Sequence, residues 1–178
     1  MKSKFLSLLL SGVFVLTCFA FSSTTLMAKK RIVFGGGPAG GTFQVVANGV
    51  QVYKPVKALK DYTIKAQSSA GSIENLRKVD RNRSQLGVVY SGHVYLGRNG
   101  MLKNDTNRYE NLLAVAFLYG APAQLVVRKG SEIKNPEDLV GKKVGVGNAG
   151  SGAFANCELF FNHLSIWDRV ERNAMGYN

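Results

Sequence analysis

The sequence has few of the residues on which metal and disulfide chemistry depends. Its 178 residues include only two cysteines and two histidines. Two cysteines exclude a disulfide framework and any zinc site made from four cysteines, and His93 lies far along the chain from His163. No HExxH or GxSxG motif occurs. We therefore expect a protein that is not an enzyme, with no catalytic residue, no metal and no cofactor.

Long hydrophobic runs are also missing after the first residues. No later stretch reaches the roughly 20 apolar residues that a membrane-spanning helix requires. Hydrophobic residues make up 46% of the chain and charged residues 19%, which excludes a disordered protein and indicates a globular one. The formal net charge is +12. A positive charge of this size is typical of nucleic-acid-binding proteins. The signal peptide described next makes a nucleic-acid partner unexpected.

The first 28 residues have the layout of a secretory signal peptide. Lys2 and Lys4 precede a mostly apolar stretch over residues 5–21, and a region of small residues ends at Ala28. We expect cleavage after Ala28 and a periplasmic location, with an uncleaved N-terminal anchor as the alternative. Once residues 1–28 are removed, Cys157 is the only cysteine, so no internal disulfide can form.

A strand, a polar loop and a helix follow one another three times along the chain. The three loops span residues 35–42, 68–72 and 148–151. Thr42 starts one of the helices and Ser72 caps another. Further strands are expected over residues 85–90, 112–118, 124–127 and 143–147, whereas the tail from residue 168 onward closes nothing. This alternation predicts an α/β fold with a mostly parallel sheet, whose ligands lie beyond the carboxyl ends of the strands.

The glycine-rich loop allows two interpretations. Gly35, Gly37 and Gly40 satisfy the dinucleotide fingerprint, so a Rossmann-type module that binds FAD or NAD through residues 35–40 is one of them. That fingerprint also requires an acidic residue at the end of the second strand, where this chain has Lys65. The second interpretation is a pocket for a small carboxylate, in which the free N–H groups of three helix N-termini bind the anion.

Several runs of the sequence resemble the solute receptors of TRAP transporters of the TAXI type. The resemblance rests on GGPAGGTF at residues 36–43, SSAGSIEN at 68–75, QLGVVYS at 85–91, LLAVAF at 112–117 and, most strongly, EDLVGKKVGVG at 137–147 followed by GSG at 150–152. These runs occur in the order of the family and cover about residues 31–165. The step DLxGKxV is shared with the wider type II periplasmic binding proteins.

The resemblance implies a type II-like periplasmic binding fold, with two α/β lobes that close on a small anionic solute such as glutamate or a dicarboxylate. The closed receptor would then deliver this amino acid or organic acid to TRAP membrane permease subunits. We expect a monomer. Carried over by motif, the ligand-binding residues are Gly41, Thr42, Phe43, Ser69, Ala70, Gly71, Ser72, Tyr90, Ser91, Asn148, Ser151 and Gly152.

The same resemblance divides the chain into a signal peptide and two unequal lobes. The boundaries are 1–28 for the signal peptide, 29–129 for the first lobe, and 130–178 for a hinge segment with part of the second lobe. Members of the family continue beyond this length, so we expect the second lobe to be incomplete. An exported interaction protein without a pocket is a third functional interpretation.

Overall fold

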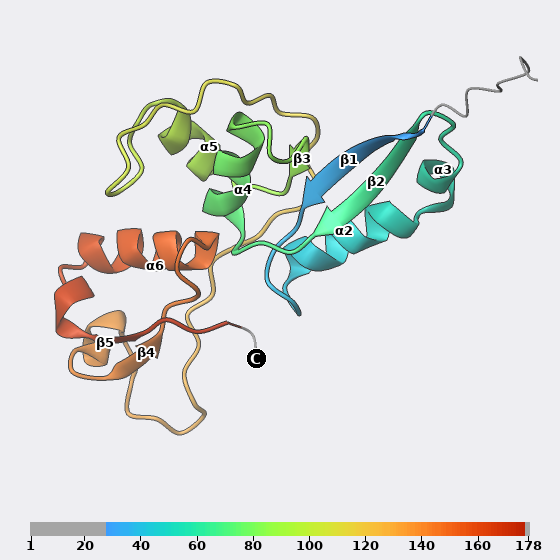
Figure 1. Ribbon diagram of the computed structural model, residues 1–178. Helices are drawn as coiled ribbons and strands as arrows, with labels where there is room; N and C mark the ends of the chain where they lie inside the picture. The colour runs from blue at the N-terminus through green and yellow to red at the C-terminus, as the bar shows by residue number, and fades with distance from the viewer. Residues whose placement is uncertain (1–27, 177–178) are drawn as a thin grey trace, which may run out of the picture.

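The computed structural model describes residues 28–176, so the predicted signal peptide lies outside the described residues except for Ala28. Figure 1 shows the elements in chain order. They are β1 (Lys30–Gly35), α2 (Thr42–Val52), α3 (Lys54–Lys57), β2 (Tyr62–Gln67), α4 (Ser72–Asp80), β3 (Leu86–Gly87), α5 (Ser91–Arg98), η1 (Pro136–Leu139), β4 (Lys143–Gly145), α6 (Gly152–His163), η2 (Trp167–Arg169) and β5 (Glu171–Asn173). Over this range, no helix combines the length and the apolar character needed to cross a membrane.

The first sheet is parallel and has the order β2-β1-β3. Every residue of β1 pairs with β2, and the last two residues of β1 also pair with β3. Gly35, at the end of β1, lies opposite both Gln67 and Gly87. The three strands therefore end at one edge of the sheet, and the loops that follow them start there. A mixed α/β fold with parallel sheets is the arrangement that the sequence predicts.

The second sheet consists of β4 and β5, which are also parallel. The sequence-based expectation that the tail closes nothing is wrong, because β5 pairs with β4 and the preceding turn enters the core. Trp167 and Val170 are buried against Phe161 of α6 and Val144 of β4. β5 has only three residues and all of them are polar, so its sequence carries little strand signal. Its pairing depends on the tertiary contacts of the turn before it.

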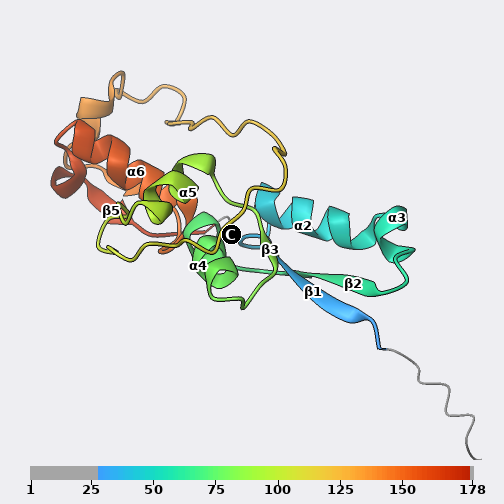
Figure 2. The same ribbon diagram turned by 90° about the horizontal axis from the view of Figure 1, so that it is seen from above.

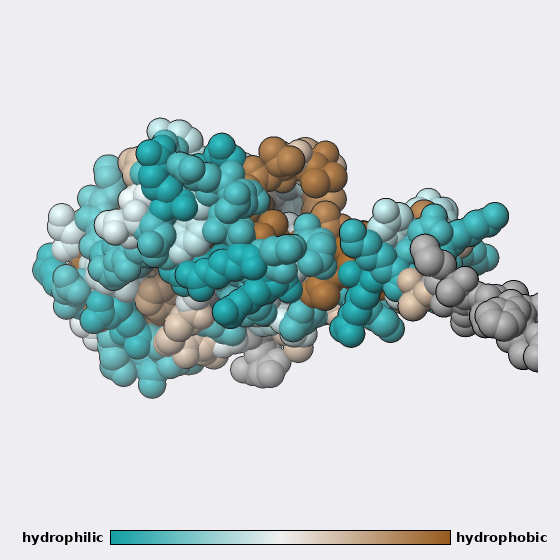
Figure 3. Space-filling model, turned by 45° about the horizontal axis from the view of Figure 1, so that its top comes forward, coloured by the Kyte–Doolittle hydropathy of each residue, from teal (hydrophilic) through white to brown (hydrophobic). Residues whose placement is uncertain are grey.

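The predicted strands over residues 112–118 and 124–127 are absent, and both stretches are extended chain without regular structure. A strand is defined by its pairing, and none of the described strands pairs with either stretch. The alternating side chains of Leu113, Val115 and Phe117 are consequently 92%, 81% and 85% exposed. Figures 2 and 3 show this part of the chain arching away from the body, with hydrophobic side chains gathered beside a hollow.

A third group of contacts fixes α4 and α5 beside the first sheet. Leu76 of α4 is fully buried with Tyr109 and Leu112. The neighbouring Arg77 donates from two nitrogens of its guanidinium to Oδ2 of Asp105. Burial raises the pKa of Asp105, but the hydrogen bonds from Tyr109, Arg77 and Asn107 outweigh burial and bring the pKa down to about 2. The carboxylate is thus ionised and holds residues 105–109 against α4.

Candidate ligand-binding site

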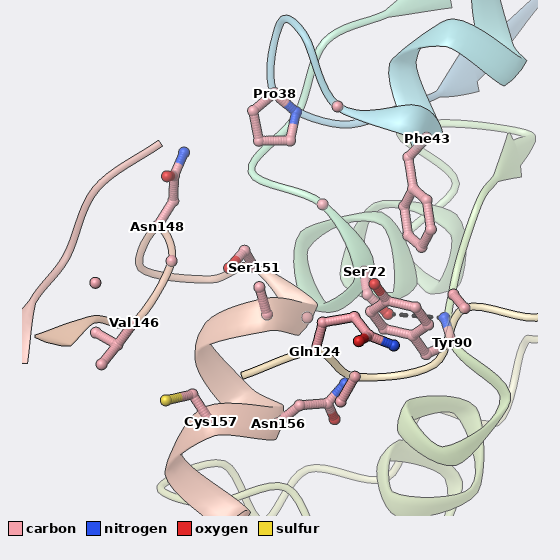
Figure 4. A pocket seen from close by; sticks show the side chains of 18 of the residues that line it. Pro38, Phe43, Ser72, Tyr90, Gln124, Val146, Asn148, Ser151, Asn156 and Cys157 are labelled. Atoms are coloured by element: carbon pink, nitrogen blue, oxygen red, sulfur yellow. Dashed lines mark hydrogen bonds between the residues drawn. The ribbon is translucent and has the colours of Figure 1, made fainter. Parts of the chain in front are cut away.

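A cavity of about 660 Å³ lies where the loops of the first sheet meet the start of α6 (Figure 4). Ten of the twelve predicted ligand-binding residues line this cavity: Gly41, Thr42, Phe43, Ala70, Gly71, Ser72, Tyr90, Asn148, Ser151 and Gly152. Ser69 and Ser91 do not line it. Three loops that are distant in the sequence are therefore brought together around one space.

The position of the first two loops follows from the register of β1 and β2. The backbone N–H of Gly36 donates to the carbonyl of Gln67 at 2.9 Å, and the N–H of Ser69 donates to the carbonyl of Gly37 at 3.2 Å. The Ser69 hydroxyl donates to the carbonyl of Gly36 at 3.1 Å and accepts from the N–H of Gly71 at the same distance. Ser69 thus joins the two loops to each other, and its hydroxyl is used within the protein.

The start of α4 contributes a buried hydroxyl rather than the cap that the sequence predicts. Gly71 is the N-cap residue and has a φ of 121°, a conformation that glycine adopts without strain. Ser72 is the first helical residue and is fully buried. Its Oγ accepts from the backbone N–H of Tyr90 at 3.0 Å and lies 2.9 Å from Nδ1 of His93. Ser72 therefore holds the segment that follows β3, at Tyr90, against the start of α4.

The start of α6 meets the start of α4 at the cavity. Ser151 caps α6, because its Oγ accepts from the N–H of Phe154 at 3.0 Å. A Cβ on the next residue, Gly152, would lie 2.9 Å from Cβ of Ser72. Only glycine permits this approach. The first N–H groups of both helices have no acceptor within their own helix and carry the positive end of the helix dipole.

Aromatic side chains form an apolar wall of the cavity. The ring centroid of Phe43, at the start of α2, lies 5.0 Å from that of Tyr90 and 6.4 Å from that of Tyr119. Figure 4 shows Phe43, Tyr90 and Ser72 on one side of the cavity and Asn148 and Val146 on the other. The arrangement offers hydrogen-bond donors at the helix starts and an apolar surface beside them. A small molecule with one polar end and one apolar part fits such a site.

Sequence analysis missed Asn156, which lines the cavity, and His93, which does not line it but contacts Ser72. His93 is 2% exposed, and its Nε2 lies 3.1 Å from Oδ1 of Asn156 on α6. An amide oxygen only accepts, so Nε2 carries the proton and Nδ1 accepts from the Ser72 hydroxyl. Burial lowers the pKa of His93, and the Asn156 contact raises it by less, so the ring is neutral. The two residues are 63 positions apart, and no local pattern links them.

Of the residue types His, Cys, Asp and Glu, the lining that the structure describes contains Cys157 alone. Within residues 28–176, no group of three His, Cys, Asp or Glu side chains lies close enough to hold a metal ion. Cys157 lines the cavity from α6, where it packs beside the core of the second sheet. Burial raises the pKa of its thiol, so the sulfur is protonated at neutral pH.

Comparison with protein families gives a match over nearly all of the described chain. The model of the NMT1-like family, a periplasmic solute-binding family related to TRAP and ABC binding proteins, matches residues 34–178. The family binds substrates without converting them and implies a small solute and a transporter as partners. The match gives no support to the dinucleotide-binding alternative. The residues of the cavity, from Pro38 to Gly176, all lie within the matched range, and the chain belongs to the NMT1-like family of solute-binding proteins.

Proposed function

We propose that the protein is the periplasmic receptor of a TRAP-type transporter of the TAXI subfamily, and that it captures a small carboxylate-bearing solute for membrane permease subunits. The observation that carries the proposal is the meeting of the α4 and α6 starts at the cavity, where Gly152 approaches Ser72. The first N–H groups of a helix have no acceptor within it, and residues at both helix starts line the same cavity, so these N–H groups could bind a single carboxylate from both sides.

The proposed receptor has two lobes, 29–129 and 130–178, joined by a hinge. The separate hydrophobic clusters support this division, since Leu139, Phe161 and Trp167 belong to a core that is distinct from the clusters around Phe34 and Leu76. The cavity lies between the elements of the proposed lobes. Closure of one lobe on the other would bring the loops around Thr42 and Ser151 onto the solute. The N-terminal signal over 1–28 would export the receptor to the periplasm.

In the proposed complex, the carboxylate of the solute lies at the helix starts and its apolar part lies on the aromatic wall. The N–H groups at the starts of α2, α4 and α6 and the hydroxyl of Thr42 donate to the carboxylate oxygens. Phe43 and Tyr90 cover the apolar part. The positive ends of the helix dipoles compensate the charge of the carboxylate, so the proposed site requires no buried arginine.

A titration of the full chain tests this function. We expect isothermal calorimetry with small monocarboxylates, dicarboxylates and acidic amino acids to give one-to-one binding for at least one compound. Thr42→Val should raise the Kd of that compound about tenfold, because a hydrogen bond to a charged group is lost. Thr63→Val, the same change on β2 away from the cavity, is the control and should bind normally. If no compound of the panel binds, the proposed function is overturned.

A further inference from the structure

Within residues 28–176, the lining of the cavity contains no side chain that is charged at neutral pH. Among the lining residues that the structure describes, there is no lysine, arginine, histidine, aspartate or glutamate. This is unusual in a chain with a formal net charge of +12 and 19% charged residues. Ion pairs such as Lys103 with Glu158 and Lys78 with Glu74 are formed by residues outside the lining. The polar side chains of the lining are amides and hydroxyls, such as Gln124, Asn148 and Thr42.

The absence of charge limits how many ionised groups a bound solute can carry. One carboxylate is compensated by the N–H groups at the helix starts. A second carboxylate would lose its hydration without gaining a cation, and an ammonium group would lose its hydration without gaining an anion. An ammonium group is also repelled by the positive ends of the helix dipoles. Both dicarboxylates and free amino acids are therefore poor fits.

The remaining surface of the cavity favours an apolar body. Phe43 and Tyr90 form one wall, and Leu125, Val146 and Phe160 add apolar surface elsewhere. We propose that the solute is a monocarboxylate whose remaining part is apolar, in place of the dicarboxylate or acidic amino acid that the sequence suggests. This inference rests on the proposed function and names the class of solute that the same site takes.

A matched series of six-carbon compounds tests the inference on the full chain. Hexanoate carries one carboxylate, adipate carries two, norleucine adds an ammonium group, and hexan-1-ol has no charge. We expect calorimetry to give the smallest Kd for hexanoate, with each of the other three at least about tenfold weaker. The comparison is repeated with compounds of four to eight carbons, so that a mismatch in length is not mistaken for a mismatch in charge.

The second test is a substitution that is expected to shift the preference of the cavity from monocarboxylates toward dicarboxylates. Gln124 lines the cavity, and Figure 4 draws its side chain with those of the other lining residues. Gln124→Lys places a cation there, so adipate should bind about tenfold tighter relative to hexanoate than it does to the unchanged protein. Ala58→Lys adds the same charge at the exposed end of α3, outside the cavity, and should leave the ratio unchanged.

The outcomes separate the two proposals. A dicarboxylate, an amino acid or an alcohol that binds as tightly as its monocarboxylate, or a Gln124→Lys variant with an unchanged ratio, overturns the inference and leaves the receptor function standing. If no compound of the series binds at any chain length, and no compound of the wider carboxylate panel binds either, both the inference and the receptor function are overturned. A monocarboxylate as the tightest ligand supports both.

Discussion

Gly152→Ala is expected to lower the free energy of unfolding by about 2 kcal/mol, since overpacking a close contact costs this much. The added Cβ would lie 2.5 Å from Cδ2 of the Tyr90 ring and 2.9 Å from Cβ of Ser72. The Ser72 atom belongs to the buried first turn of α4 and cannot swing away as the end of a long side chain would. The starts of α4 and α6 must therefore separate, and solute binding should be lost together with stability.

Urea denaturation followed by circular dichroism measures this effect, and the chain offers a matched control. Gly92 also lies in a helix, α5, and a Cβ there would meet no atom within 4 Å. Gly92→Ala should therefore raise stability by roughly 0.5–1 kcal/mol through its better helix propensity. Equal stabilities for Gly152→Ala and Gly92→Ala would contradict the close packing of the two helix starts.

His93→Leu is expected to cost about 3 kcal/mol of stability, because it leaves two polar groups without their partner. The Ser72 hydroxyl would lose its acceptor, and Oδ1 of Asn156 would lose its donor. A double-mutant cycle with Asn156→Ala should give a coupling energy of about 1 kcal/mol between the two positions. Additive effects of the two substitutions would show that the His93–Asn156 contact does not join α5 to α6.

The lowered pKa of His93 predicts how the stability of the folded protein depends on pH. Burial lowers the pKa of His93 in the folded protein, whereas the unfolded chain keeps the ordinary value of about 6.5. Below that value the unfolded state takes up a proton that the folded state does not, so the stability contributed by the neutral ring is lost as the pH falls. Thermal unfolding between pH 7.5 and 5 should show this decline in the unchanged protein. His93→Gln, which cannot titrate, should show a smaller decline over the same range.

Much of the candidate site follows from local sequence patterns. The apolar strands that end at Gly35 and Gln67 are parallel, so the loops after them had to emerge at one edge of the sheet. Ser151 is a standard N-cap residue before an apolar helix, and the structure has it in that role. These features depend on residues close together in the sequence.

Other features depend on contacts between distant residues, and local patterns did not reveal them. Serine commonly caps helices, which is why the sequence predicts this role for Ser72. In the structure Gly71 is the N-cap residue, and the Ser72 hydroxyl contacts His93 and the backbone of Tyr90. The segment over residues 112–118 has the alternation of a strand, but strand structure requires a pairing partner. The short β5 has almost no strand signal and forms because β4 pairs with it.

The most direct test of the binding site is a titration with hexanoate, followed by nuclear magnetic resonance of the backbone amides. Thr42, Ser72 and Gly152 each provide the first N–H group of a helix that begins at the cavity. The amide signals of all three should move with one and the same dissociation constant, because one carboxylate contacts all three helix starts. Shifts confined to a single loop, or different dissociation constants for the three residues, would contradict a shared binding site.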